Sequence, residues 1–400
     1  MSPQVEDYFR ITCEYMKTHG PKTIVLYLSG DWYEVYALID SEGKYAVVDV
    51  DGTYLPSCIQ DIHHYLNADI SPPKEEGASG THTYMGKQVV RTGVRQAFVH
   101  QSVRSLIAAG YTVPRVDQYP RIINGIPVLK NGKPVFDRKV SHIYTAGTYD
   151  DKESVKLTNH IACYWFHYAS KDRVCNKNML YCGMTILDSY TGTIRSQETA
   201  VEVTHDSNCF DSIGGFHEIQ NPFEVLVVTN MPETLYDSMS KHVFTNTPKV
   251  LIIDLTNKGD QQTKAKHIEK RDVQKCFIEQ YYAAKHHITL NDMFMEYRYS
   301  SYALCYLLDY VKLCNPDIVE MLHVPTYDRQ NAHMRTGNHS LVQLNIISAG
   351  QENSMLQFLN QCITSIGRRE FNRHLLYPIT NKTILQSRYD IIDYIQHNWE

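Results

Sequence analysis

The 400-residue sequence lacks several features that would assign it to a common class of protein. Its apolar runs are short, and Ile24–Leu28 is far below the roughly 18 residues that a membrane helix needs. No basic segment followed by an apolar one opens the chain, so we expect no signal peptide. Neither sign of charge dominates, with 39 basic and 44 acidic side chains. We therefore expect an intracellular protein of undetermined compartment with no membrane partner, in which any nucleic-acid surface is local.

The usual motifs for metals and nucleotides are also absent from the sequence. The ten cysteines are dispersed and form no Cys-x-x-Cys pair, which argues against a zinc site and against a disulfide framework. Three Gly-Lys pairs are followed by Tyr45, Gln88 and Pro134 rather than by Ser or Thr, so none belongs to a phosphate-binding loop. We expect no catalytic residue, no metal site and no cofactor within these 400 residues.

The hydrophobic periodicity predicts a multidomain α/β chain that ends in helices. Residues 1–130 alternate helical and strand-like patterns, including a strand, a tight turn and a strand over 23–39. Residues 135–255 read as a second α/β region, and the polar stretch 256–275 reads as a linker or an exposed connection. Beyond residue 276 the pattern is helical, and we expect each apolar stripe there to pack into a core. Three such stripes are Ala303, Leu304, Leu307, Leu308 and Val311; Met355, Leu356, Leu359 and Ile363; and Ile391, Ile392 and Ile395.

The last of these stripes reaches Glu400 without a glycine, a proline or another stop signal. This pattern predicts that the chain was cut inside a larger protein.

Charge is unevenly placed along the first domain. Residues 1–80 carry 13 acidic and 5 basic side chains, whereas residues 84–140 carry 10 basic and 2 acidic ones. A basic half can simply offset an acidic half on a solvated surface, or it can bind phosphate. Arg91 and Arg95 flank Gly93 in what reads as a turn, and glycine permits a close approach of the backbone there.

A large aromatic side chain and a carboxylate stand two residues apart just past a tight turn. In a strand, Trp32 and Glu34 project from the same face. A large apolar side chain can enter a base step of DNA and unstack it, and this costs least where the pairing is already defective. A tryptophan in a strand is more often a core residue, and spacing alone does not decide between the two interpretations.

Five blocks of sequence, in a fixed order from residue 25 to residue 378, resemble the MutS family of DNA mismatch-repair ATPases. They are Val25–Tyr36 with its Gly-Asp-Trp-Tyr-Glu centre, Arg91–Gln118, Arg138–Thr148, Thr185–Gly192 and Gly367–Pro378. The first block is similar to the family's Gly-Asp-Phe-Tyr-Glu segment, whose Phe-x-Glu reads the mismatch. The divergent later blocks look more like the viral or organellar branches of the family.

The resemblance implies a mismatch-binding domain at 1–130, a ribonuclease-H-like α/β connector at 131–275 and the start of an all-α core at 276–400. It implies that Trp32 takes the place of the intercalating phenylalanine, with Glu34 as its partner. The larger indole puts the specificity for mismatches in question even where stacking is retained.

The resemblance also places Arg91 and Thr92 in a turn beside the mismatch. Arg95 stands where the family has proline, and it adds charge near the DNA backbone. The implied ligand is mismatched double-stranded DNA. The implied ATPase, with its ATP and Mg²⁺, lies beyond residue 400, and the same missing part would form a homodimer.

Two other functions remain open at this point. A diverged member of the family could have lost mismatch reading and serve as a scaffold for partners. The connector could instead be a metal-dependent nuclease that uses Asp188, at the end of a predicted strand, as a metal ligand.

Overall fold

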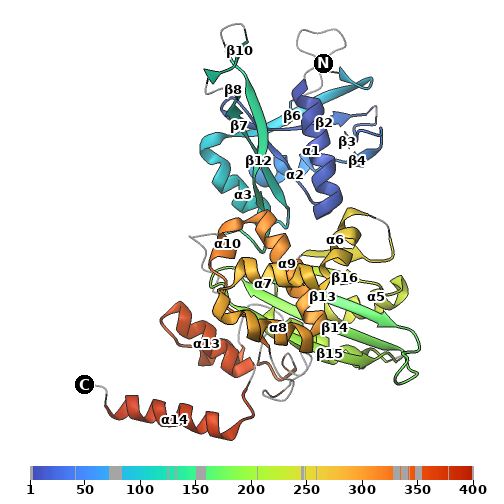
Figure 1. Ribbon diagram of the computed structural model, residues 1–400. Helices are drawn as coiled ribbons and strands as arrows, with labels where there is room; N and C mark the ends of the chain where they lie inside the picture. The colour runs from blue at the N-terminus through green and yellow to red at the C-terminus, as the bar shows by residue number, and fades with distance from the viewer. Residues whose placement is uncertain are drawn as a thin grey trace. The chain divides into compact units, whose positions relative to one another are not determined.

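The computed structural model describes residues 3–40, 42–71, 83–123, 126–130, 133–149, 159–204, 206–244, 247, 249–257, 259–327, 334, 341, 343–346, 354–376 and 378–398. The chain divides into two compact units (Figure 1). The first is Met1–Asp151 with Lys312–Pro316, and the second is Lys152–Val311 with Asp317–Glu400. Among the described helices, none combines the length and the apolar character that a membrane crossing requires.

The first unit is a mixed sheet with helices packed against it. Its helices are α1 (Pro3–His19), α2 (Ile59–Leu66) and α3 (Val99–Ala108), the last preceded by the 3₁₀ turn η1 (Gln96–Phe98). Its principal strands are β1 (Leu26–Ser29), β2 (Trp32–Ile39), β3 (Tyr45–Val48), β4 (Tyr54–Pro56), β5 (Thr83–Tyr84), β6 (Lys87–Arg95), β7 (Val113–Pro120) and β12 (Phe136–Tyr144). Four two-residue strands form small hairpins between β7 and β12: β8 (Ile122–Ile123), β9 (Ile126–Pro127), β10 (Leu129–Lys130) and β11 (Lys133–Pro134).

The sheet of the first unit has the spatial order β12-β7-β1-β2-β3-β4, and β6 pairs with β2 and with β5. Only β1 and β7 run parallel; the remaining pairs are antiparallel. β12 lies after the expected boundary at residue 130, yet it completes this sheet through a long ladder with β7.

Helix α1 covers one face of this sheet, as its sequence predicts. The side chains expected on its inner stripe are all buried: Val5, Tyr8, Phe9, Thr12 and Met16. Tyr8 meets Tyr27 of β1 and Tyr36 of β2 edge-on, with ring centroids 6.0 and 5.2 Å apart. Helices α2 and α3 pack against β6 and β7 and bury Ile59, Val103 and Leu106, among other residues.

The second unit is built on another mixed sheet. Its strands are β13 (His160–Ala169), β14 (Met179–Asp188), β15 (Ile194–Glu202), β16 (Glu224–Thr229), β17 (Lys249–Asp254) and β18 (Thr326–Tyr327). The helices that follow or separate them are α4 (Asp211–Gln220), α5 (Glu233–Val243), α6 (Asp260–Ile268), α7 (Arg271–Tyr281), α8 (His287–Glu296), α9 (Arg298–Cys314), α10 (Pro316–Glu320), α12 (Met355–Leu359), α13 (Ser365–Leu376) and α14 (Lys382–His397).

The strand order of this second sheet is β17-β16-β13-β14-β15-β18. β13, β14 and β15 form an antiparallel meander, and β16 and β17 then add in parallel beside β13. This is the ribonuclease-H-like arrangement expected for the connector. β13 and β16 lie in the middle of the sheet and are buried almost throughout, which explains their continuous apolar runs. The α/β multidomain fold class is thereby confirmed.

Helix α9 contains the first of the three helical stripes, and its side chains are buried as predicted. The helix begins where the Glu198 carboxylate of β15 accepts hydrogen bonds from the backbone N–H groups of Tyr299 (2.7 Å) and Ser300 (3.0 Å). A carboxylate at this position satisfies two donors that a helix start leaves unpaired. Gly183 lets the helix approach, because a Cβ there would lie 2.0 Å from the Tyr299 carbonyl carbon.

Two expectations for the helical region are wrong. Residues 256–275 are not a linker, since α6 and the start of α7 occupy most of them. Among the described residues, the second and third apolar stripes do not pack into a core. The second is divided between α12 and Ile363, which lies beyond that helix, and the third is on α14. Ile363 is 92% exposed, and Ile391 and Ile392 are more than half exposed.

Candidate nucleic-acid interface

The hairpin of β1 and β2 brings Trp32 to the surface. Gly30 turns the chain with a φ of +62°, a conformation that glycine adopts without strain. Ser29 and Trp32 then pair as the last and first residues of the two strands. The Trp32 side chain is 43% exposed, whereas the neighbouring Tyr33 is fully buried. The alternation of a strand thus sends the indole outward and the phenol inward.

Strands β2 and β6 form a grid of three residue pairs on the face that carries Trp32. Trp32 lies opposite Arg95, Glu34 opposite Gly93, and Tyr36 opposite Arg91. The predicted turn at residues 91–95 is therefore wrong, because this segment is the second half of β6. The β-branched residues between Val89 and Val94 favour a strand and pair with β2 along its whole length.

Gly93 is required by the close approach of the two strands. A Cβ at this position would lie 2.5 Å from the backbone oxygen of Tyr33. Its lack of a side chain leaves room over Glu34, so Arg91, one pair further along, reaches the carboxylate. The glycine in the sequence thus serves strand packing.

Glu34 is held by two donors on its own face. The Arg91 guanidinium donates to one carboxylate oxygen at 2.9 Å, and the hydroxyl of buried Tyr36 donates to the other. Burial, and then the Glu34 carboxylate, raises the pKa of Tyr36, so its hydroxyl stays protonated and donates. We call Tyr36, Glu34 and Arg91 the outer cluster.

Arg95 stacks on the indole. Its guanidinium carbon lies 5.3 Å from the centroid of the Trp32 ring, within the range of a cation–π interaction. The Arg95 side chain is exposed. The wedge candidate therefore carries a positive charge directly beside it.

Thr92 is not brought to the same face as the other predicted site residues. Its side chain is buried, and its hydroxyl donates to the carbonyl oxygens of Ala68 (3.2 Å) and Asp69 (3.0 Å). It alternates with Arg91 and Gly93 and points to the opposite side of β6. Its hydroxyl anchors the segment that follows α2, so the structure gives it a supporting position within the groove wall.

A groove of about 890 Å³ runs along β6 beside Trp32. Its walls come from the end of α2, the segment that follows it, η1 and α3. The exposed ring of Phe98, at 58%, is one lining residue that the sequence analysis missed. Phe98 stands directly before the amphipathic helix α3 but outside the apolar stripe of that helix. This position is the sequence signal that could have indicated an exposed aromatic ring.

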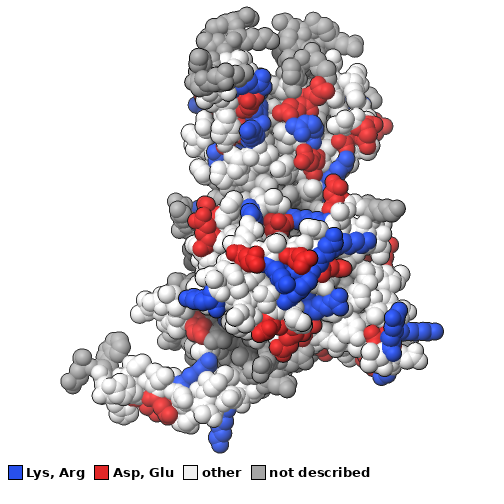
Figure 2. Space-filling view, in the orientation of Figure 1, with Lys and Arg blue, Asp and Glu red and all other residues white. Residues whose placement is uncertain are grey.

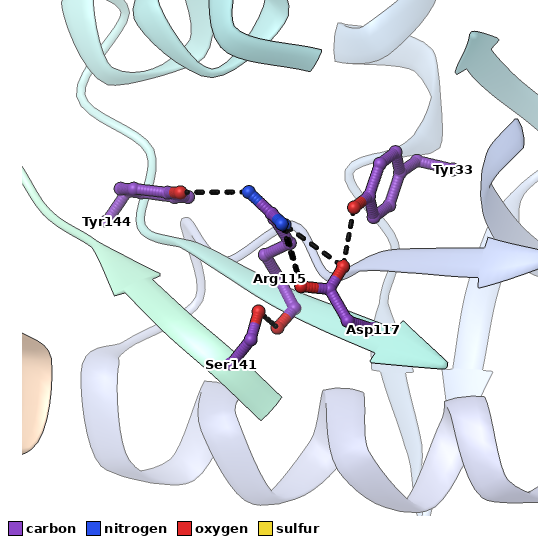
Figure 3. Close-up of polar contacts among 5 residues, drawn as sticks. All are labelled: Tyr33, Arg115, Asp117, Ser141 and Tyr144. Carbon is purple, nitrogen blue, oxygen red and sulfur yellow. Dashed lines mark hydrogen bonds and ion pairs between the residues drawn. The ribbon is translucent and has the colours of Figure 1, made fainter. Parts of the chain in front are cut away.

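The neighbouring strand residue Tyr33 belongs to a buried polar cluster on the other face of the sheet (Figure 3). Its hydroxyl donates to Asp117 of β7, and the Arg115 guanidinium binds the same carboxylate at 2.8–3.1 Å. Arg115 also donates to the Tyr144 hydroxyl at 3.3 Å. We call Tyr33, Asp117 and Arg115 the inner cluster. It links the first residues of β2 to β7.

The acidic and basic halves of the first unit meet in one sheet. Among the described residues of this unit, six lysine or arginine side chains form ion pairs with carboxylates: Arg10 with Asp7 and Glu14, Lys17 with Asp49, Lys44 with Glu42, Arg91 with Glu34, Arg115 with Asp117 and Arg121 with Asp137. Figure 2 shows both signs interspersed on the visible face of this unit. Arg91 and Arg95 place exposed positive charge at the groove itself.

Asp188, the candidate nuclease ligand, organises a turn. Its carboxylate accepts hydrogen bonds from the backbone N–H groups of Asn159 (3.3 Å) and Tyr190 (3.1 Å) and from the Thr191 hydroxyl (2.8 Å). Within the described part of the chain, no three His, Cys, Asp or Glu side chains lie close enough together to hold a metal ion. No observation on these residues favours the nuclease alternative.

Known proteins match this chain in two comparisons of sequence. Residues 339–400 match the family model of MutS domain III. A DNA mismatch repair MutS homologue of Acanthamoeba polyphaga mimivirus is 23% identical over 418 residues, which cover 96% of this chain and 34% of the viral protein. Both matches support a MutS-family protein of a viral branch. The chain spans about a third of the viral relative's length.

A solved structure of Fowlpox virus resolvase in complex with Holliday junction DNA also matches this chain. The identity is 18%, and the match covers 38% of this chain and 97% of the resolvase chain. The TM-score is 0.25, and this likeness carries no argument about the fold or the function.

Proposed function

We propose that this chain recognises mismatched or distorted double-stranded DNA, as the N-terminal part of an ATP-dependent mismatch-repair protein. Trp32 acts as a wedge that enters a base step from the minor groove. The observation that carries the proposal is the position of the indole: 43% exposed, at the start of a strand that is paired on both sides. The resemblance to the MutS family supports it, because the residues around Trp32 are similar to the family's mismatch-reading segment.

The physics of the wedge depends on the DNA as much as on the protein. Stacking of an aromatic ring on a base contributes roughly 1–3 kcal/mol, whereas unstacking a base step costs a few kcal/mol. The two nearly cancel on intact duplex. At a mismatch the bases are already less well paired and stacked, so unstacking them costs less free energy and binding is favoured there. The discrimination therefore rests on how easily the DNA deforms.

The arginines of the grid supply attraction to the backbone of the DNA. Arg91 and Arg95 both lie on the wedge face and are exposed. Contacts with phosphate hold a protein on the duplex irrespective of sequence, and they weaken with salt. By resemblance Glu34 is the polar partner of the wedge. ATP, Mg²⁺ and a homodimer belong, in this proposal, to a part of the protein beyond residue 400.

Replacing Trp32 by alanine tests the proposal. We expect Trp32→Ala to lose the preference for mismatched over paired duplex, by roughly 5- to 150-fold in affinity, which corresponds to 1–3 kcal/mol of stacking. Salt-sensitive binding to paired duplex should persist. Fluorescence anisotropy with matched duplexes at two salt concentrations measures both quantities.

Tyr54→Ala is the matched control, because the Tyr54 side chain on β4 is also 43% exposed. It should keep the preference for mismatched DNA. Equal losses by Trp32→Ala on both duplexes would contradict the wedge, and mismatch-blind binding by the unaltered chain would favour the scaffold alternative. Mg²⁺-dependent cleavage that Asp188→Asn abolishes would favour the nuclease.

A further inference from the structure

Both oxygens of the Glu34 carboxylate already accept a hydrogen bond on the wedge face. Arg91 donates to one oxygen and Tyr36 to the other, and the Glu34 side chain is only 15% exposed. The Arg91 contact is easily exchanged, because the Arg91 side chain is 63% exposed and surface ion pairs contribute little. The Tyr36 contact is different. Turning Glu34 toward a base would leave the phenol of Tyr36, a residue that is 6% exposed, without its acceptor, and a buried donor without a partner is costly.

Arg95 has the opposite character. Its guanidinium carries five N–H donors, and among the described residues its recorded contact is with the face of Trp32. A guanidinium that stacks on a ring keeps its N–H groups pointing outward at the edge of that ring. When the indole stacks on a base, these donors come level with the edge of the neighbouring base. The group beside the wedge that is ready for a new hydrogen bond is therefore a donor.

We infer that Arg95, and not Glu34, is the residue that reads base edges beside the Trp32 wedge. The inference rests on the proposed function and changes its specificity. Glu34 becomes a positioning residue that fixes Arg91 and Tyr36 next to the wedge. If Arg95 is the reader, the preferred ligand is a deformable base step that presents hydrogen-bond acceptors. If a carboxylate were the reader, the preferred base step would present donors.

The chemistry of the minor groove turns this inference into a mismatch preference. Adenine N3 and thymine O2 are acceptors there, whereas guanine adds the N2 amino group as a donor. An arginine donor pairs with the acceptors and is opposed by the amino group. The site should therefore favour mispairs without guanine, such as T·T, over mispairs that contain it, such as G·T.

Substitution of inosine for guanine in a G·T mispair provides the decisive test. Inosine lacks the N2 amino group, which takes no part in the pairing of a G·T wobble. We expect the unaltered chain to bind the I·T duplex more tightly than the G·T duplex, by at least about fivefold, the lower end of the energy of one good base contact. A fall in affinity on the I·T duplex would overturn the inference in favour of a carboxylate reader.

Variants locate the effect without relying on a single folded mutant. Arg95→Lys keeps the charge but not the planar guanidinium, so it should lose the inosine effect, and its binding to paired duplex should change less than that effect. Glu34→Gln should retain the inosine effect. Arg10→Lys, at a side chain of α1 that is 53% exposed, is the control for a generic arginine substitution and should change neither quantity. Equal losses by Arg95→Lys on all duplexes would mean that Arg95 contacts phosphate alone, which also overturns the inference.

The inference and the proposed function fail in different ways. If Trp32→Ala keeps the mismatch preference, the wedge itself is wrong. If Trp32→Ala loses that preference while the I·T duplex binds less tightly than the G·T duplex, the wedge stands and Arg95 is not its reader.

Discussion

Strand β2 contributes to two clusters, one on each face of the sheet, and each consists of a tyrosine, an arginine and a carboxylate. In the outer and the inner cluster alike, a tyrosine hydroxyl and an arginine donate to one carboxylate. They differ in access to water: the Arg91 side chain is 63% exposed, and that of Arg115 is 19% exposed. Water can replace Arg91 at little cost but has little access to the inner cluster. In our proposal, the same chemistry therefore serves DNA binding on one face and stability on the other.

The largest contrast should appear when each cluster loses its carboxylate. Asp117→Ala leaves Arg115 and Tyr33 without their shared acceptor in a largely buried site. Removing one partner of a buried pair costs about 3–5 kcal/mol, and we expect the free energy of unfolding to fall by about 3 kcal/mol. Chemical denaturation followed by circular dichroism measures it. A loss below about 1 kcal/mol would show that water replaces the carboxylate and that the two clusters are equivalent.

A smaller effect should follow from acid. Burial alone would raise the pKa of Asp117, but hydrogen bonds from Arg115 and Tyr33 and the charge of Arg115 outweigh it and hold that pKa below its usual value. A carboxyl with a lowered folded-state pKa stabilises the fold above its unfolded pKa of about 3.9. This stabilisation is lost as the pH falls through the folded-state pKa.

The matched variant for this titration is Asp117→Asn. The unaltered chain should lose more free energy of unfolding between pH 5 and pH 2 than the variant does, and denaturation at each pH measures the difference. Parallel curves for the two proteins would mean that folding does not lower the pKa of Asp117.

The smallest effect belongs to the outer cluster. Arg91→Ala removes an exposed ion pair, and we expect it to change the free energy of unfolding by less than about 1 kcal/mol. Its effect on DNA should be larger than its effect on stability, with weaker binding to paired and mismatched duplexes alike. A strong destabilisation by Arg91→Ala would remove the difference between the two faces.

A comparison of α9 with α14 shows how much of the molecule could be predicted from the sequence. Both have an apolar stripe at helical spacing, and both are helices. The Leu307 side chain on α9 is buried, whereas that of Ile392 on α14 is 57% exposed. Periodicity specifies which face of a helix is apolar, but it does not specify what covers that face. Local sequence patterns likewise do not predict the strand order of either sheet. An example is β12, which lies after the expected domain boundary yet pairs with β7 in the first sheet.

The errors at residues 256–275 and 91–95 have chemical causes. Polar composition suggested a linker, yet Gln262 and Gln274 lie at inward positions because their amides donate to the backbone carbonyls of Leu255 (2.5 Å) and Ile268 (3.1 Å). A buried glutamine with such a partner is indistinguishable in sequence from a solvated one. Gly93 suggested a turn, although its role is to let β6 approach β2. The direction of the Trp32 side chain followed from alternation alone, but its contact with Arg95 required the pairing of two distant strands.

The hydrogen-bonding of β2 has a mechanical consequence. Trp32 is paired with Ser29 on one side and with Arg95 on the other, and the Gln96 N–H donates to the Asp31 carbonyl at 2.9 Å. The backbone that carries the indole is therefore held by hydrogen bonds on both sides within the sheet. In the complex that we propose, the two ladders would keep this backbone in place against stacked bases, so the nucleic acid would bend rather than the hairpin.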